Sequence, residues 1–166
     1  SQVIIGGDSA GGNLVLALLA QLLQEAADVP AGVFAFSPLT DLTFSGASFQ
    51  VNADADVILP ADRAAEMMDY YLDGADPALP LASPLFADFT GAPSVWLTVG
   101  DTEILLDDTR RLVANMSKQG VDVQMHIERD LPHVWPIFHN VLPEARMTLD
   151  GLAEWINRRV GWADES

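Results

Sequence analysis

Ser9 lies in a glycine-rich stretch, Gly6-Gly7-Asp8-Ser9-Ala10-Gly11-Gly12, that follows the apolar run Val3-Ile4-Ile5. The pattern Gly7-x-Ser9-x-Gly11 is typical of a nucleophile elbow, a sharp strand-to-helix turn that requires small side chains around the serine. There the hydroxyl lies at a helix N-terminus, where backbone N–H groups stabilise developing negative charge. The stretch predicts a nucleophile for acyl transfer, and the alternative is a glycine-rich turn with an incidental serine.

A serine nucleophile needs a neighbouring base, and the chain has three histidines. His126 falls on the polar face of an expected strand, and His139 follows Pro136 in an expected helical turn. Both are predicted to be surface or packing residues. His133 lies in a loop directly after the last expected strand, at the carboxyl edge of the sheet that also presents Ser9. We therefore predict that His133 is the base.

The carboxylates that could orient this histidine crowd one loop, which contains Asp101, Glu103, Asp107 and Asp108. Asp107 and Asp108 are expected in the first turn of a helix, where their charges complement the helix dipole. Asp101 and Glu103 can each reach back towards a histidine. The resulting order of serine, acid and histidine is that of the α/β-hydrolase fold and differs from the chymotrypsin and subtilisin orders.

Several segments together resemble the hormone-sensitive-lipase-like esterases, bacterial carboxylesterases of the α/β-hydrolase fold. They are residues 6–12, Ser37-Pro38, Ser83-Pro84, Glu103-Ile104-Leu105-Leu106-Asp107-Asp108 and Pro132-His133. The family's acid opens a segment resembling Asp-Pro-Leu-x-Asp, and its first position falls on Glu103. The resemblance therefore implies Glu103 as the acid, with Asp101 as the alternative. The family's His-Gly-Gly-Gly loop, which supplies most of its oxyanion hole, occurs nowhere in these residues.

The resemblance implies a serine carboxylesterase that hydrolyses small, short- to medium-acyl esters through a Ser-His-Glu triad and an acyl-enzyme. Ser9 would attack the ester carbonyl while His133 takes and returns the proton and Glu103 holds the imidazole. The backbone N–H of Ala10 would give one oxyanion-hole contact. The alternatives are a non-hydrolytic ligand-binding member of the same fold and a serine peptidase or thioesterase.

Alternation of strand and helix patterns predicts a parallel sheet with helices on both faces. Strands are expected at 3–5, 31–36, 94–99 and 121–128, and helices at 13–27, 60–72, 105–119 and 143–160. The helix at 13–27 is apolar nearly all round, which predicts burial on more than one side. Gly120 is expected to cap the helix that precedes it.

The whole chain, residues 1–166, is predicted to be the C-terminal portion of one α/β-hydrolase domain, apparently lacking the N-terminal strands and cap. Residues 39–89 are irregular and are interpreted as a cap-like insertion. Within it, Met67, Met68, Tyr70 and Tyr71 are interpreted as packing against the sheet in preference to lining a substrate pocket.

Charge and composition limit the partners. The chain has 24 acidic residues against 8 Lys and Arg, a net charge of −16, which argues against nucleic acid and anionic membranes. It has no cysteine, no metal-ligand cluster and no phosphate-binding loop, so neither cofactor nor metal is predicted. We expect a small-molecule ester as the substrate and a cytoplasmic location.

The edges of the expected sheet predict further partners. Val3-Ile4-Ile5 has the apolar pattern of a central strand, yet no preceding strand in the sequence can pair with its other side. We expect a missing N-terminal segment or a second polypeptide to cover this edge and to carry the oxyanion loop. The strand at 121–128 is expected at the opposite edge, and a homodimer through it is a further hypothesis.

Overall fold

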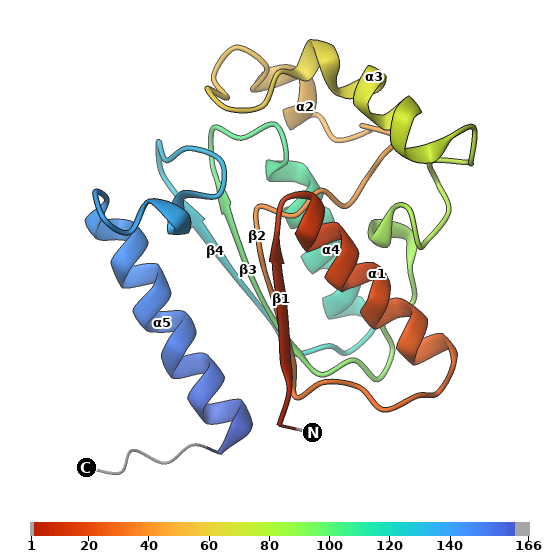
Figure 1. The fold of residues 1–166 in the computed structure, drawn as a ribbon, viewed down its shortest axis with the longest axis vertical. Helices are drawn as coiled ribbons and strands as arrows, with labels where there is room; N and C mark the ends of the chain where they lie inside the picture. Colours follow the sequence, from red (N-terminus) through yellow and green to blue (C-terminus); the bar gives the residue numbers. More distant parts are fainter. Residues whose placement is uncertain (1, 162–166) are drawn as a thin grey trace.

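A computed structural model describes residues 2–161 (Figure 1). Its strands are β1 (Ile4–Asp8), β2 (Gly32–Phe36), β3 (Ser94–Gly100) and β4 (Val123–Glu128), which form one parallel sheet in the order β1-β2-β3-β4. Because all four strands run the same way, their carboxyl ends meet at one edge of the sheet. The predicted parallel sheet is confirmed.

Helices cover both faces of the sheet, as the alternating pattern predicts. Helices α1 (Ala10–Gln24) and α4 (Leu106–Lys118) pack on one face, and α5 (Pro143–Val160) packs on the other (Figure 1). Successive strand residues point to opposite faces, so β2 contributes to both cores. Its Val33 and Ala35 join the core under α1 and α4, whereas Phe36 joins Trp155 of α5 on the other side.

Helix α1 starts at Ala10, three residues before the predicted start, because it begins directly after the serine of the elbow. The prediction that this helix is buried on more than one side is wrong for two leucines. Leu14 and Leu18 are 58% and 44% exposed on the side away from the sheet.

Within residues 2–161, β1 has β2 as its one neighbouring strand.

The irregular region between β2 and β3 contains α2 (Ser48–Val51), α3 (Ala61–Leu72) and the short 3-10 helix η1 (Pro84–Phe86). Helices α2 and α3 lie together beyond the carboxyl ends of the strands (Figure 1). Met68 of α3 is buried, but Met67, Tyr70 and Tyr71 are exposed. The interpretation that these side chains pack against the sheet is therefore wrong for the last three, because α3 does not lie on a face of the sheet.

Strand β4 forms an edge of the sheet, as predicted, and leads through the loop of His133 to the 3-10 helix η2 (Trp135–Phe138) and then α5. Gly120, with a φ of +80°, ends α4 as predicted. The homodimer through β4 stays a prediction. No helix in the described part of the chain is long and apolar enough to cross a membrane.

Candidate active site

The turn from β1 into α1 holds Ser9 in an unusual backbone conformation, with φ +50° and ψ −115°. Two glycines make the turn possible. A Cβ on Gly7 would lie 2.3 Å from the backbone oxygen of Gly11, and a Cβ on Gly12 would lie 2.8 Å from Cβ of Pro38. Gly11 itself has its nearest such neighbour, Oδ1 of Asp8, at 3.9 Å, so a Cβ fits at this position and glycine itself is not required.

Hydrogen bonds fasten the elbow to the end of β2. The N–H of Ser9 donates to the carbonyl of Phe36 at 2.9 Å, and the carbonyl of Ser9 accepts from the N–H of Leu39 at 3.1 Å. The buried Asn13, in the first turn of α1, donates its side-chain amide to the carbonyls of Leu39 and Ala82 at 2.9 and 2.8 Å. The serine therefore sits on a rigid support, which an activated nucleophile requires.

Ser9, His133 and Glu103 lie in one hydrogen-bonded series. Nε2 of His133 is 2.8 Å from Oγ of Ser9, and Nδ1 is 2.6 Å from Oε2 of Glu103. The three residues follow β1, β4 and β3, so the common edge of the parallel sheet brings them together. His133 is 6% exposed and Glu103 is 1% exposed, which shields the histidine–carboxylate contact from water.

The second oxygen of Glu103, Oε1, accepts hydrogen bonds from the Ser37 hydroxyl at 2.8 Å and from the N–H of Gly100. Ser37 is fully buried directly after β2, and its hydroxyl also accepts from the N–H of Val134 at 3.2 Å. No role was predicted for Ser37. The sequence feature that could have identified Ser37 is its position. It places a hydroxyl at the carboxyl end of β2, and β2 pairs with β3, the strand that leads to the acid.

Asp101, the alternative acid, lies in the same loop but makes a different contact. Its Oδ1 accepts a hydrogen bond from the N–H of Asp130 at 2.9 Å, and its own N–H donates to the carbonyl of Glu128. Asp101 thereby joins the loop after β3 to the loop that leads to His133. The structure brings Glu103, and not Asp101, to the histidine.

Asp107 and Asp108 lie in the first turn of α4, as predicted. Asp107 accepts the N–H of Ser48, and the buried Asp108 accepts the N–H groups of Thr40 and Asp41 at 2.7 and 2.9 Å. Both carboxylates also hold the segment that follows β2, a role that was not predicted. Burial raises the pKa of Asp108 to about 7, although the two backbone hydrogen bonds act in the opposite direction.

The other two histidines lie away from this series. His126 is exposed on β4, where its ring lies 4.6 Å from the ring of Trp96, and burial of part of the imidazole lowers the pKa of His126. His139 is exposed after η2. Both match the expectation of surface or packing residues.

Ala10 is the first residue of α1, so its backbone N–H has no acceptor within its own helix. The N-terminal end of a helix also carries partial positive charge. This N–H follows Ser9 directly, where it can donate to an oxyanion formed by attack of the serine.

Two apolar cavities of about 120 and 190 Å³ open beside the elbow. Ser9 lines the smaller one, and Ala10, Leu39, Met67 and Met68 line both. The remaining lining residues of the smaller cavity are Phe44, Phe49, Leu59, Pro60, Ala64, Ile104 and Leu105. An apolar cavity that reaches the nucleophile is suited to the hydrocarbon part of a substrate.

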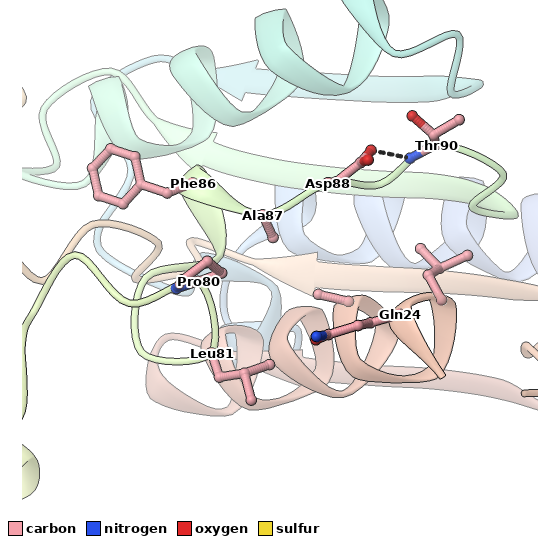
Figure 2. Close-up of a pocket in the computed structure, with 9 residues that line it drawn as sticks. Gln24, Pro80, Leu81, Phe86, Ala87, Asp88 and Thr90 are labelled. Atoms are coloured by element: carbon pink, nitrogen blue, oxygen red, sulfur yellow. Dashed lines mark hydrogen bonds between the residues drawn. The ribbon is translucent and has the colours of Figure 1, made fainter. Parts of the chain in front are cut away.

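A more polar hollow of about 400 Å³ lies between the end of α1 and the loops around η1 (Figure 2). Gln24, Leu81 and Phe86 line it, and Asp88 there bonds the N–H of Thr90. Gln24 ends α1, roughly 20 Å along the helix from Ser9. This hollow is therefore remote from the hydrogen-bonded series.

A sequence model of the α/β-hydrolase fold matches residues 1–137. The chain is 35% identical over 160 residues to an acetyl-hydrolase of Streptomyces hygroscopicus, covering 96% of this chain and 54% of that protein. It is 35% identical over 154 residues to an esterase of Acinetobacter venetianus, and the match covers 92% of this chain and 51% of that protein. The chain thus spans about half the length of these curated relatives.

Solved structures are similar to this chain over about the same share of their length. The crystal structure of an esterase from the bacterial hormone-sensitive lipase family superposes with a TM-score of 0.91 at 38% identity. The match covers 95% of this chain and 53% of that one. A hormone-sensitive lipase from a metagenome library gives a TM-score of 0.90 at 36% identity, over 94% and 54% of the two chains.

Proposed function

We propose that this chain, which belongs to the α/β-hydrolase family, is the triad-bearing part of a serine carboxylesterase. The observation that carries the proposal is the hydrogen-bonded series from Oγ of Ser9 through His133 to Glu103, at 2.8 and 2.6 Å. Relatives named as an acetyl-hydrolase and an esterase support ester hydrolysis as the reaction.

In this mechanism, Oγ of Ser9 attacks the ester carbonyl as its proton passes to Nε2 of His133. Glu103 accepts the Nδ1–H of His133, which fixes the tautomer and stabilises the imidazolium that forms. Collapse of the tetrahedral intermediate breaks the ester C–O bond, and Nε2 returns the proton to the leaving alcohol. Water, deprotonated by the same histidine, then hydrolyses the acyl-enzyme and restores Ser9.

The oxyanion is stabilised in part by the N–H of Ala10. Removing one oxyanion donor costs roughly 10²–10³ in rate, so an efficient esterase needs further donors beside Ala10. We assign these donors to residues outside this chain, in an N-terminal segment or a second polypeptide. The length of the relatives supports this assignment, as does β1, whose one neighbouring strand in the described residues is β2.

A direct comparison tests this assignment. The full-length protein should hydrolyse p-nitrophenyl acetate at least 100-fold faster than residues 1–166 expressed alone, and the isolated chain should aggregate or recruit another polypeptide. A monomeric 1–166 fragment with the turnover of the full-length protein would contradict it.

The cavity at Ser9 supports small esters as the substrate class. Its volume of about 120 Å³ and its apolar lining, which includes Phe49, Met68 and Ile104, suit a short- to medium-length acyl chain. The net charge of −16 disfavours anionic substrates. A panel of p-nitrophenyl esters of increasing acyl length should show falling kcat/KM once the acyl chain exceeds the cavity.

Covalent labelling separates an esterase from a non-hydrolytic ligand-binding protein. A fluorophosphonate should modify the full-length protein at one site, which peptide mapping places at Ser9. Labelling together with turnover of the p-nitrophenyl esters is the expected result. Absence of both overturns the proposal, and preferential cleavage of peptide or thioester substrates would reassign the leaving group while keeping the nucleophile.

A further inference from the structure

Residues 48–56, comprising α2 and the turn that follows it, lie against residues 101–107, which are the loop that carries Glu103 and the first two residues of α4. We call the first the brace segment and the second the acid loop. The acid loop continues from the end of β3 and contains turns up to the start of α4. Its backbone therefore depends on other segments for its position.

Asn52 of the brace segment donates its side-chain amide to two carbonyls of the acid loop. Nδ2 lies 2.8 Å from the carbonyl oxygen of Glu103 and 3.1 Å from that of Asp101. Asp56 holds the N–H of the same peptide group that follows Glu103, where its Oδ2 accepts the N–H of Ile104 at 2.9 Å. The peptide group that follows the acid is thus held at both its carbonyl and its N–H, and the carbonyl of Asp101, two residues before the acid, is held as well.

Ser48 adds a third point of attachment. Its hydroxyl donates to the carbonyl of Ile104 at 2.7 Å and accepts the N–H of Asp107 at 2.9 Å. Its own N–H donates to the Asp107 carboxylate at 2.9 Å. Ser48 is buried, so losing these partners would leave polar groups of the acid loop unsatisfied.

The local backbone hydrogen bonds of the acid loop, to the end of β3 and to the start of α4, are longer. The N–H of Glu103 reaches the carbonyl of Gly100 at 3.3 Å, and the N–H of Leu106 reaches the carbonyl of Glu103 at 3.2 Å. Both distances are at the long end for N–H···O hydrogen bonds. The bonds that Asn52, Asp56 and Ser48 make to Glu103 and Ile104, at 2.7–2.9 Å, are shorter than both.

We propose that the brace segment sets the position of the Glu103 carboxylate against His133 and that Asn52 is a positioning residue for acyl transfer. This inference rests on the proposed esterase function. The brace segment also supplies Phe49 to the wall of the cavity at Ser9. The cap-like region between β2 and β3 thereby supports the triad as well as bounding the substrate cavity.

The test compares Asn52→Leu with Asn115→Leu in the full-length protein. Asn115 is a matched control, because its Nδ2 also donates to a backbone carbonyl, that of Leu85, at 3.1 Å and away from the acid loop. Active sites are titrated with a fluorophosphonate, and kcat and KM for p-nitrophenyl acetate are then measured per labelled site. Asn52→Leu should lower kcat about tenfold with KM within twofold, since small misplacements of catalytic groups cost up to about 10²-fold.

Asn115→Leu should at most lower the melting temperature. Its kcat per site should stay within twofold of the parent. Asp56 supplies a second pair of variants: Asp56→Ala removes the acceptor and should lower kcat, whereas Asp56→Asn retains a side-chain carbonyl and should restore it. The inference is overturned if Asn52→Leu and Asp56→Ala keep the parental kcat per site. A parent protein that neither hydrolyses the ester nor takes the label overturns the proposed function itself.

Discussion

Ser37 donates its hydroxyl to Oε1 of Glu103 at 2.8 Å, while Oε2 of the same carboxylate lies 2.6 Å from Nδ1 of His133. Both oxygens of the acid are thereby engaged, which fixes the rotation of the carboxylate. The Ser37 oxygen also accepts the N–H of Val134, the residue after the histidine. One hydroxyl thus joins the loop of the acid to the loop of the base.

Ser37→Ala should lower kcat for p-nitrophenyl acetate about tenfold, equivalent to roughly 1.4 kcal/mol, and leave KM within twofold. The reason is that Ser37 orients Glu103 but does not line either apolar cavity beside Ser9. The measurement is steady-state kinetics on the full-length protein, normalised to titrated active sites.

Thr98→Val is the matched control for Ser37→Ala. Thr98 is equally buried on the neighbouring strand β3, and its hydroxyl has no hydrogen-bond partner among the described residues. Its removal should leave kcat unchanged. Equal losses of kcat in the two variants would show that any buried hydroxyl here matters only for packing.

Glu103→Gln should lower kcat roughly 10³–10⁴-fold, because an amide can no longer hold the histidine tautomer or stabilise the imidazolium. Asp101→Asn should stay within about threefold of the parent, since an asparagine Oδ1 can still accept the N–H of Asp130. The kinetics of both variants decide between the two candidate acids. The reverse pattern would make Asp101 the acid.

Gly7→Ala should destabilise the protein by at least about 1–3 kcal/mol, because the new Cβ would lie 2.3 Å from the backbone oxygen of Gly11. Gly11→Ala should be neutral or stabilising by up to about 1 kcal/mol, since Gly11 is helical and has space around it. Denaturant unfolding of both variants measures the difference. Equal stabilities would contradict the steric account of the elbow.

Asp108→Asn should change the pH dependence of stability. Burial raises the folded-state pKa of Asp108 from 3.8 to about 7, so the folded protein binds a proton that the unfolded chain has released. The free energy of unfolding of the parent should therefore fall as pH rises from about 4 to 7, by up to about 1.4 kcal/mol per pH unit.

The asparagine variant does not titrate at this position, so the stability of the parent relative to Asp108→Asn should decrease between pH 5 and pH 7. Denaturant unfolding at several pH values gives this difference directly. A constant difference over that range, or one that increases with pH, would contradict the assigned pKa of Asp108.

The sequence predicted the three residues of the candidate triad to different degrees. The elbow is local in sequence, so Ser9 and the turn followed from glycine spacing. His133 followed from its place after a strand, because parallel strands bring their following loops to one edge. Glu103 could not be separated from Asp101 on the residues alone, since both lie in one loop and their side-chain directions depend on the backbone between them.

The contacts around the acid could not be predicted, because they join positions far apart in the chain. Ser37 and Glu103 are 66 residues apart, and Asn52 and Glu103 are 51 apart. Such pairs depend on the register of β2 against β3 and on the course of the region that precedes α3. The same holds for Asp108, whose place in the first turn of α4 was predicted but whose hydrogen bonds to the backbone at Thr40 and Asp41 were not.

Ser9 is proposed as the nucleophile of an esterase, and the decisive measurement compares kcat for p-nitrophenyl acetate of the parent with that of Ser9→Ala. Ser117→Ala, an exposed serine on α4, serves as the control and should match the parent. We predict that Ser9→Ala lowers kcat roughly 10⁶-fold while the melting temperature stays within a few degrees. Activity of Ser9→Ala within tenfold of the parent would show that Ser9 is not the nucleophile.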